Sequence, residues 1–227
     1  MKVHSKMNSG VIALLLLLSL ALANCGNVLL FPQETDTAYV QLTPKKPLNL
    51  QAFTLCMRVA SELTNNRETI LFAYRTSQAD ELNVWQEKGY LLYLRSSGEG
   101  VMFKLPPLSV VPIHLCVTWE SRTGATAFWV NARRTMLKIY RRGFSVSIGG
   151  AIILGQDPDL YLGSFDKGQS FVGEITDVHM WDSVLGGGQI KQLYEDQCQA
   201  PRGNVLDWNS LQYKINGNVV QVTGPEA

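Results

Sequence analysis

The chain has 227 residues, and its 20 Lys and Arg residues nearly balance its 19 Asp and Glu residues, which gives a formal net charge of +1 at pH 7. A charge this close to zero, with no basic stripe in the sequence, does not fit a nucleic-acid-binding protein. Hydrophobic residues make up 46% of the chain, which is enough for a sizeable core and excludes a disordered chain.

The N-terminal segment has the pattern of a secretory signal peptide. Two lysines precede an apolar run, residues 11–23, that ends in small residues around Ala23. The run of about 13 residues is shorter than the ~20 residues that a membrane-spanning helix needs. We therefore expect a secreted, extracellular protein without a membrane span, with residues 1–23 as signal peptide and residues 24–227 as one domain.

Most of the remaining chain predicts β-strands. Short segments of alternating apolar and polar residues recur about every ten residues, separated by Gly, Pro, Asn and Asp. These segments are residues 27–31, 38–42, 53–59, 68–74, 82–86, 90–94, 101–105, 114–119, 126–130, 151–155, 171–181 and 213–222. The pattern predicts an all-β domain, a two-sheet sandwich of jelly-roll type.

Two turns and one helix complete the prediction. Asn216-Gly217 predicts a β-hairpin, because both central residues of a type I′ turn need positive φ. Asn131-Ala132 indicates another hairpin, although Ala in place of Gly costs roughly 1 kcal/mol there, so a different turn remains open. Residues 187–197 carry a narrow apolar stripe that predicts the one short helix.

The chain has four cysteines, Cys25, Cys56, Cys116 and Cys198, which fit an oxidising compartment. Cys56 and Cys116 each lie in the middle of an alternating apolar segment. We expect both cysteines to point into the interior of the sheets. This position predicts a disulfide between adjacent strands. Cys25 and Cys198 could pair with each other or bridge to another subunit, and the sequence does not choose between these.

The loop after residue 154 concentrates oxygen ligands. Asp157 and Asp159 flank Pro158, and an extended segment points residues i and i+2 the same way, so both carboxylates can converge. Asp166 and Gln169 follow and can fold back toward them. Carboxylate and amide oxygens on a bent loop are what Ca²⁺ takes, but a solvated polar loop is an equal alternative at this point.

A second polar patch, DELNVW at residues 80–85, contains Asp80 before a strand and Trp85 within it. Asp80 could complete a metal site, and Trp85 could form the wall of a ligand pocket. Enzyme motifs are missing from the sequence, and the two histidines after the signal peptide fit structural roles. A pair such as Glu174 with Asp157 could imitate the two carboxylates of a glycosidase, but we expect no enzyme activity.

The segment HLCVTWES, residues 114–121, matches the pentraxin signature His-x-Cys-x-Ser/Thr-Trp-x-Ser/Thr at every specified position. The resemblance continues through residues 124–134, 152–159, 170–185 and 204–213, and the chain is similar to the short pentraxin family over nearly its whole length after the signal peptide. It implies a concanavalin- or lectin-like jelly roll with a Cys56–Cys116 disulfide. It also implies a homo-oligomeric ring, usually a cyclic pentamer, and two Ca²⁺ ions per protomer.

Carried over residue by residue, the resemblance makes Asp157 and Asp159 the bridge between both ions and gives Pro158 a ligating carbonyl. Asp166 and Gln169 match the ligands that complete the second site. For the first site, the family pattern Asn-Glu-Leu-Leu-Val-Tyr aligns with residues 80–85 and puts Asp80 on the Asn. Ala79 then stands where the family has Asp, so one ligand is missing.

An alignment without a gap puts Asp80 on the family Asp and Glu81 on the Asn. The first alignment keeps the apolar residues of the strand in register. Trp85 then takes the aromatic position of the ligand pocket, and Glu99 is a candidate for the acid that meets a choline ammonium group.

The resemblance implies a calcium-dependent pattern-recognition protein of innate immunity and the acute phase. Its expected ligands are phosphocholine, phosphoethanolamine or polysaccharide on microbial or damaged-cell surfaces. The opposite face would engage the first component of complement or Fc-type receptors. The alternatives are a calcium-dependent carbohydrate-binding lectin and a jelly-roll glycoside hydrolase.

Overall fold

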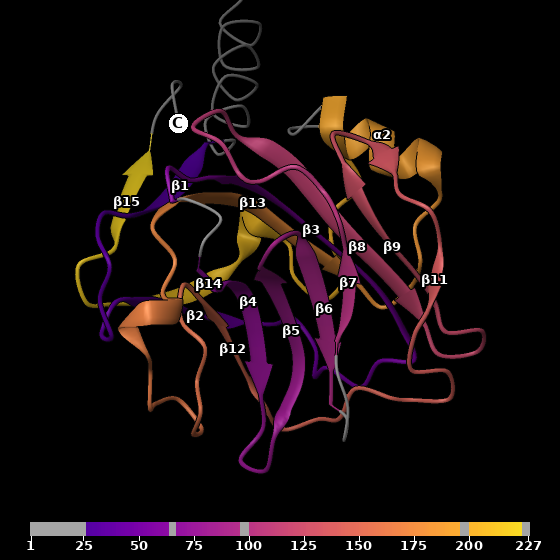
Figure 1. Ribbon diagram of the computed structural model, residues 1–227, viewed down its shortest axis with the longest axis horizontal. Helices are drawn as coiled ribbons and strands as arrows, with labels where there is room; N and C mark the ends of the chain where they lie inside the picture. The colour runs from indigo at the N-terminus through magenta and orange to yellow at the C-terminus, as the bar shows by residue number, and fades with distance from the viewer. Residues whose placement is uncertain (1–25, 64–66, 96–99, 196–199, 224–227) are drawn as a thin grey trace, which may run out of the picture.

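The computed structural model describes residues 26–63, 67–95, 100–195 and 200–223. Expectations for the signal peptide, Cys25, Cys198 and Glu99 fall outside these residues. The described residues fold into two antiparallel sheets that face each other (Figure 1), which confirms the predicted all-β sandwich. No helix within the described ranges is both long and apolar enough to span a membrane.

Sheet A has eight strands and forms one layer. Its strands are β10 (Arg133–Arg134), β9 (Ala125–Val130), β8 (Ile113–Glu120), β3 (Ala52–Ala60), β13 (Gly173–Trp181), β1 (Asn27–Phe31) and β15 (Val220–Thr223) in this order, and β11 (Lys138–Ile139) also pairs with β9. Strands β11 and β15 therefore lie at opposite sides of the molecule (Figure 1).

Sheet B has seven strands and forms the second layer. Its strands are β14 (Gln212–Asn216), β2 (Tyr39–Thr43), β12 (Ala151–Leu154), β4 (Thr69–Arg75), β5 (Asp80–Gln86), β6 (Tyr90–Leu94) and β7 (Val101–Phe103). Two 3₁₀-helices, η1 (Lys167–Gln169) and η2 (Trp208–Ser210), lie in the loops.

The core fills the space between the sheets. Alternate residues of each strand point inward, so Phe53 of β3 packs on Trp119 of β8 with ring centroids 5.8 Å apart. Phe72 of β4 and Val84 of β5 join the same buried cluster from sheet B. Burial of large side chains from both layers is what holds a sandwich together.

The helix α2 (Gly187–Glu195) covers the outer face of sheet A, beside β8 and β9 (Figure 1). Its Ile190 and Leu193 pack on Trp181 and on the disulfide between Cys56 and Cys116. The pairing on adjacent strands is confirmed, but the expectation that both cysteines point into the interior between the sheets is wrong. Both faces of β3 are buried, one by sheet B and one by α2.

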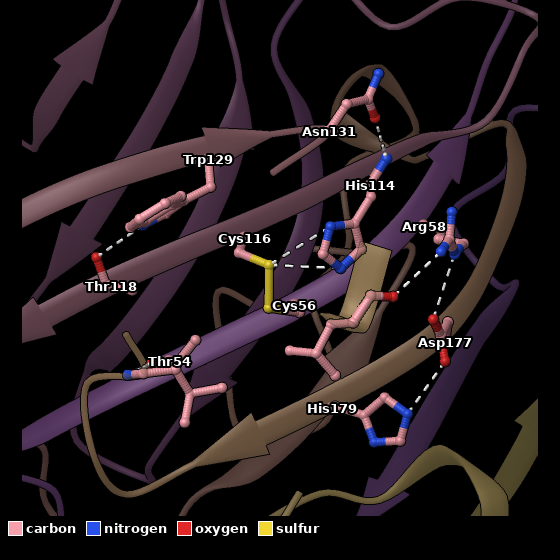
Figure 2. The surroundings of a disulfide bond; sticks show 12 residues. Thr54, Cys56, Arg58, His114, Cys116, Thr118, Trp129, Asn131, Asp177 and His179 are labelled. Carbon is pink, nitrogen blue, oxygen red and sulfur yellow. Dashed lines mark hydrogen bonds and ion pairs between the residues drawn. A yellow bond between two sulfur atoms is a disulfide. The ribbon is translucent and has the colours of Figure 1, made fainter. Parts of the chain in front are cut away.

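His114 lies beside this disulfide under α2, with its ring nitrogens 3.6 and 3.9 Å from Cys116 Sγ (Figure 2). Burial, and then the charge of Arg58, lower the pKa of His114 to about 4. The other titratable groups around it are Asp177 and His179 on β13 and Tyr194 on α2. The ring is therefore neutral in the folded protein at neutral pH.

We predict an acid-labile contribution to stability from His114. Between pH 6.5 and pH 4 the unfolded chain binds the proton and the folded chain does not. The free energy of unfolding therefore falls with falling pH by up to about 1.4 kcal/mol per pH unit from this residue. His114→Phe, which cannot be protonated, should flatten the slope in urea unfolding across this window. Equal slopes for both proteins would refute this origin of the acid sensitivity.

The two predicted hairpins have different outcomes. Asn131 and Ala132 have φ of 48° and 63° and join β9 to β10, so this hairpin is confirmed with Ala in the left-handed region. The prediction of a hairpin at Asn216-Gly217 is wrong, because β14 pairs with β2 in sheet B and β15 pairs with β1 in sheet A. Only Gly217 of that pair has positive φ, 71°, and the turn carries the chain between the layers.

Candidate functional site

A β-bulge in β5 brings polar residues to the outer face of sheet B. Ala73 of β4 lies opposite Asn83, but Arg75 lies opposite Asp80, so β5 has one extra residue between these pairs. Ala73 and Arg75 are two apart and share a face, so their partners Asn83 and Asp80 share it too. Bulges commonly re-aim a side chain beside a functional site.

The loop after β12 places Asp157 against this face. Ile153 of β12 also lies opposite Ala73, which puts the start of the loop next to β4 and β5. Gly155 has φ of 88°, and a Cβ there would lie 2.2 Å from the ring of Phe31, so only Gly fits this sharp turn. The buried side chain of Gln156 donates from Nε2 to Ala38 O at 3.2 Å and fixes the loop to the edge of β2.

Asp157 is buried among other charges. It is 7% exposed, and Nδ2 of Asn83 donates to its Oδ1 at 2.9 Å. Burial, together with the negative charges of Asp80 and Asp159, raises the pKa of Asp157 to about 7. Arg75 opposes this shift and forms an ion pair with Asp80, Nη1 to Oδ1, at 2.7 Å.

The groups present fit a hard divalent cation. The atoms that could ligate a metal here are the carboxylate oxygens of Asp80, Asp157 and Asp159. The side-chain oxygen of Asn83 is also buried without a hydrogen-bond partner among the described residues. A cation would satisfy that oxygen and offset the repulsion between the carboxylates. The carboxylates of Asp80, Asp157 and Asp159 do not lie within 4.8 Å of one another as a set. An ion would therefore draw them together in competition with Arg75.

The other loop residues of the predicted site lie at different depths. Pro158 is buried and Asp159 is exposed, next to Asp157. Asp166 accepts a hydrogen bond from Gly168 N at 2.7 Å and thereby caps η1, the helix that includes Gln169 and contacts β4. Asp166 and Gln169 thus lie at the end of the same loop, and their role as ligands stays a prediction.

The second polar patch is divided between two environments. Trp85 is partly exposed and lies two residues from Asn83 on the same face. Glu81 is fully buried, accepts a hydrogen bond from Ser147 N at 2.8 Å and pairs with Arg95. Because its carboxylate is held by these partners, the alignment that makes Glu81 a ligand loses support.

Sequence reasoning missed Asn83 and Arg75. Asn83 lies between Leu82 and Val84 and reads as one polar residue in a strand. A signal existed, because Asn is unfavourable within a buried strand unless its amide has a partner. Arg75 gave no signal, since it depends on the bulge that pairs it with Asp80.

The groups considered for catalysis do not gather with this site. Glu174 is exposed on β13 of sheet A, whereas Asp157 lies on the outer face of sheet B. Within the described ranges, the one set of three potential metal ligands within 4.8 Å is Cys56, His114 and Cys116. The two sulfurs of that set form the disulfide, so they are not thiolate ligands.

Comparison with known proteins agrees with the fold. C-reactive protein from Danio rerio is 54% identical over 200 residues, which cover 87% of this chain and 89% of that protein. Serum amyloid P-component from Cavia porcellus is 40% identical over 196 residues, 85% of each chain. The native heptameric SAP-like pentraxin from Limulus polyphemus has a similar structure, with a TM-score of 0.77 at 20% identity, covering 89% of this chain and 97% of that one.

The match to a family model has nearly the bounds of the described fold. The model of the Pentaxin family matches residues 27–223, from the first strand of sheet A to its last. The match contains the signature around Cys116, the disulfide and the acidic loop. The chain belongs to the pentraxin family.

Proposed function

We propose that this pentraxin is a secreted, calcium-dependent pattern-recognition protein that binds phosphate-bearing ligands. The observation that carries the proposal is the buried Asp157, which shares the outer face of sheet B with Asp80, Asp159 and an amide whose oxygen has no partner among the described residues. Buried carboxylates that repel one another are a cost to folding unless a cation is bound.

Two Ca²⁺ ions per protomer would use the residues of the loop and of β5. Asp80, Asp157, Asp159 and the carbonyl of Pro158 would hold the first ion. The second would be held by Asp157, Asp159, Asp166 and Gln169. Calcium takes six to eight oxygen ligands, so each ion keeps open positions for phosphate oxygens of a ligand.

An apolar strip beside these residues fits the rest of such a ligand. Trp85 lies opposite Leu91 of β6, and Leu91 lies opposite Met102 of β7, so the three side chains share the face of Asn83. All three are partly exposed. Phosphocholine or phosphoethanolamine would place its phosphate on the ions and its ethyl chain against Trp85.

A ring of protomers would multiply this weak contact. The two edges of sheet A expose apolar side chains: Met136, Leu137 and Ile139 are 74, 49 and 69% exposed at one edge, and Val220 and Val222 are 47 and 42% exposed at the other. Packing one edge against the opposite edge of the next copy is a head-to-tail contact, which generates a ring where the rotation between copies closes. Several sites on one face give avidity for a microbial or damaged-cell surface.

The ligand is tested by retention on immobilised phosphocholine. The protein should bind the resin in calcium, elute in EDTA and elute with free phosphocholine or phosphoethanolamine. Trp85→Ala should weaken retention without changing calcium binding, because the aromatic wall is lost while the ligands remain. Elution by simple sugars instead would favour the carbohydrate-binding lectin. Sugar release that Glu174→Gln abolishes would favour a glycoside hydrolase.

The effector role is part of the same proposal. A ring that presents its calcium face to a surface leaves its other face, which carries α2, available to complement or an Fc-type receptor. Opsonin activity would then follow from surface binding without any catalysis by the chain.

A further inference from the structure

Asn83 is a polar side chain at a strand position where an apolar one would pack. It is 2% exposed and lies between Leu82 and Val84, which both point into the core. Its Nδ2 donates to Asp157 Oδ1 at 2.9 Å, whereas its Oδ1 is buried with no hydrogen-bond partner in the described part of the chain. Leaving a buried acceptor unsatisfied destabilises the folded state, so this oxygen needs a partner of another kind.

The side chain of Asn83 lies on the face of β5 that also carries Asp80. The bulge puts Asn83 and Asp80 on one face, as the partners of Ala73 and Arg75 show. Ala73 is fully buried and carries only a methyl group, so it leaves room between β12 and β5 for the side chains of Asp157 and Asn83.

The chain departs from the family pattern at two positions of this face. In the alignment with the family pattern, Ala79 stands at an Asp and Asn83 at a Leu. The first change removes a ligand oxygen before β5, and the second adds one within it. Ala79 is partly exposed, and its methyl group supplies no ligand to an ion.

We propose that the side-chain oxygen of Asn83 is a calcium ligand of the first site and replaces the carboxylate that is missing at Ala79. This inference rests on the proposed calcium function of Asp80, Asp157 and Asp159. Asn83 Nδ2 lies 2.9 Å from Asp157 Oδ1, so the Asn83 amide adjoins a carboxylate that would hold the ion. Its unpartnered oxygen is the atom of this amide that can ligate a hard cation.

Using the Asn83 amide in place of a carboxylate at residue 79 should lower the calcium affinity of the first site. An amide oxygen is neutral, so the first site would hold its ion with one negative charge fewer than a site with Asp at residue 79. Calcium affinity follows the number of charged ligands and the rigidity of the site. The first site of this chain should therefore bind more weakly than the same site after Ala79→Asp.

The test is a calcium titration by calorimetry together with the calcium-induced shift of the melting temperature. Asn83→Leu installs the family residue and should weaken one of two ions at least about tenfold, while Asn83→Asp should keep or tighten it. Gln86→Leu is the matched control, since it removes a buried amide from the same strand on the opposite face. It should leave both ions unchanged.

A double variant separates loss of a ligand from misfolding. Ala79→Asp added to Asn83→Leu should restore the affinity, which a misfolded chain would not do. Equal affinity of Asn83→Leu and the unaltered chain would overturn the role of Asn83 while leaving the calcium function intact. Absence of calcium binding in the unaltered chain and in Gln86→Leu would overturn both.

Discussion

Asp157→Asn is expected to raise the stability of the calcium-free protein and to abolish its stabilisation by calcium. Asp157 is buried beside Asp80 and Asp159, and these charges and its burial raise its pKa to about 7. An amide of the same shape keeps a partner for Asn83 and removes one repelling charge. We expect a gain of about 1–3 kcal/mol in EDTA at pH 8, where the carboxyl group is ionised.

In calcium the same substitution should act in the opposite direction. A ligand at a hundred times its Kd stabilises the folded state by about 2.7 kcal/mol, and the variant should lose this increment because Asp157 would bridge both ions. Thermal unfolding in EDTA and in calcium measures both effects. Glu174→Gln, which removes an exposed carboxylate from sheet A, is the control and should change neither. A variant that calcium still stabilises fully would contradict the assignment of Asp157.

Glutamate on either exposed edge of sheet A is expected to break the ring into smaller species. Ile139 is 69% exposed at one edge and Val222 42% at the other. If these edges meet in the ring, Ile139→Glu or Val222→Glu buries a charge in an apolar contact, which costs several kcal/mol per interface. Light scattering during size-exclusion chromatography should show monomers for both variants.

These variants should change surface binding without changing calcium binding. Calcium binding per protomer should stay unchanged, because the site lies on sheet B, whereas retention on a dense phosphocholine surface should fall by about 10²- to 10⁴-fold as avidity is lost. Val184→Glu is the matched control, since this 46% exposed residue lies between Ser183 and Leu185, which both hydrogen-bond Thr54 of the inner strand β3. Intact rings in both edge variants would contradict the edge-to-edge contact.

Much of the fold follows from local patterns in the sequence. Alternation predicts the strands because each one has a core-facing side, and the helix follows from its apolar stripe. The pattern could not tell which face of β3 holds Cys56, because sheet B buries one face and α2 the other. Nor could Asn216-Gly217 reveal that its two strands join different sheets, since a turn motif carries no information about the partners of the strands.

The candidate site was predictable in its loop and only in part in its strand. Proline geometry and the family pattern bring Asp157 and Asp159 together, and the structure places Asp80 near them. One extra residue in β5 puts Asn83 and the Arg75–Asp80 pair on the same face of the sheet. No local pattern in residues 76–85 predicts this bulge. Residues that act through strand register are visible only once the register is known.

The most direct measurement of the central claim is a calorimetric calcium titration of the recombinant protein, unaltered and as Asp159→Asn. We predict two ions per protomer for the unaltered chain and a loss of binding in the variant, because Asp159 would bridge both ions. Equal binding by the two proteins, or no binding by either, would contradict a calcium site built on this loop.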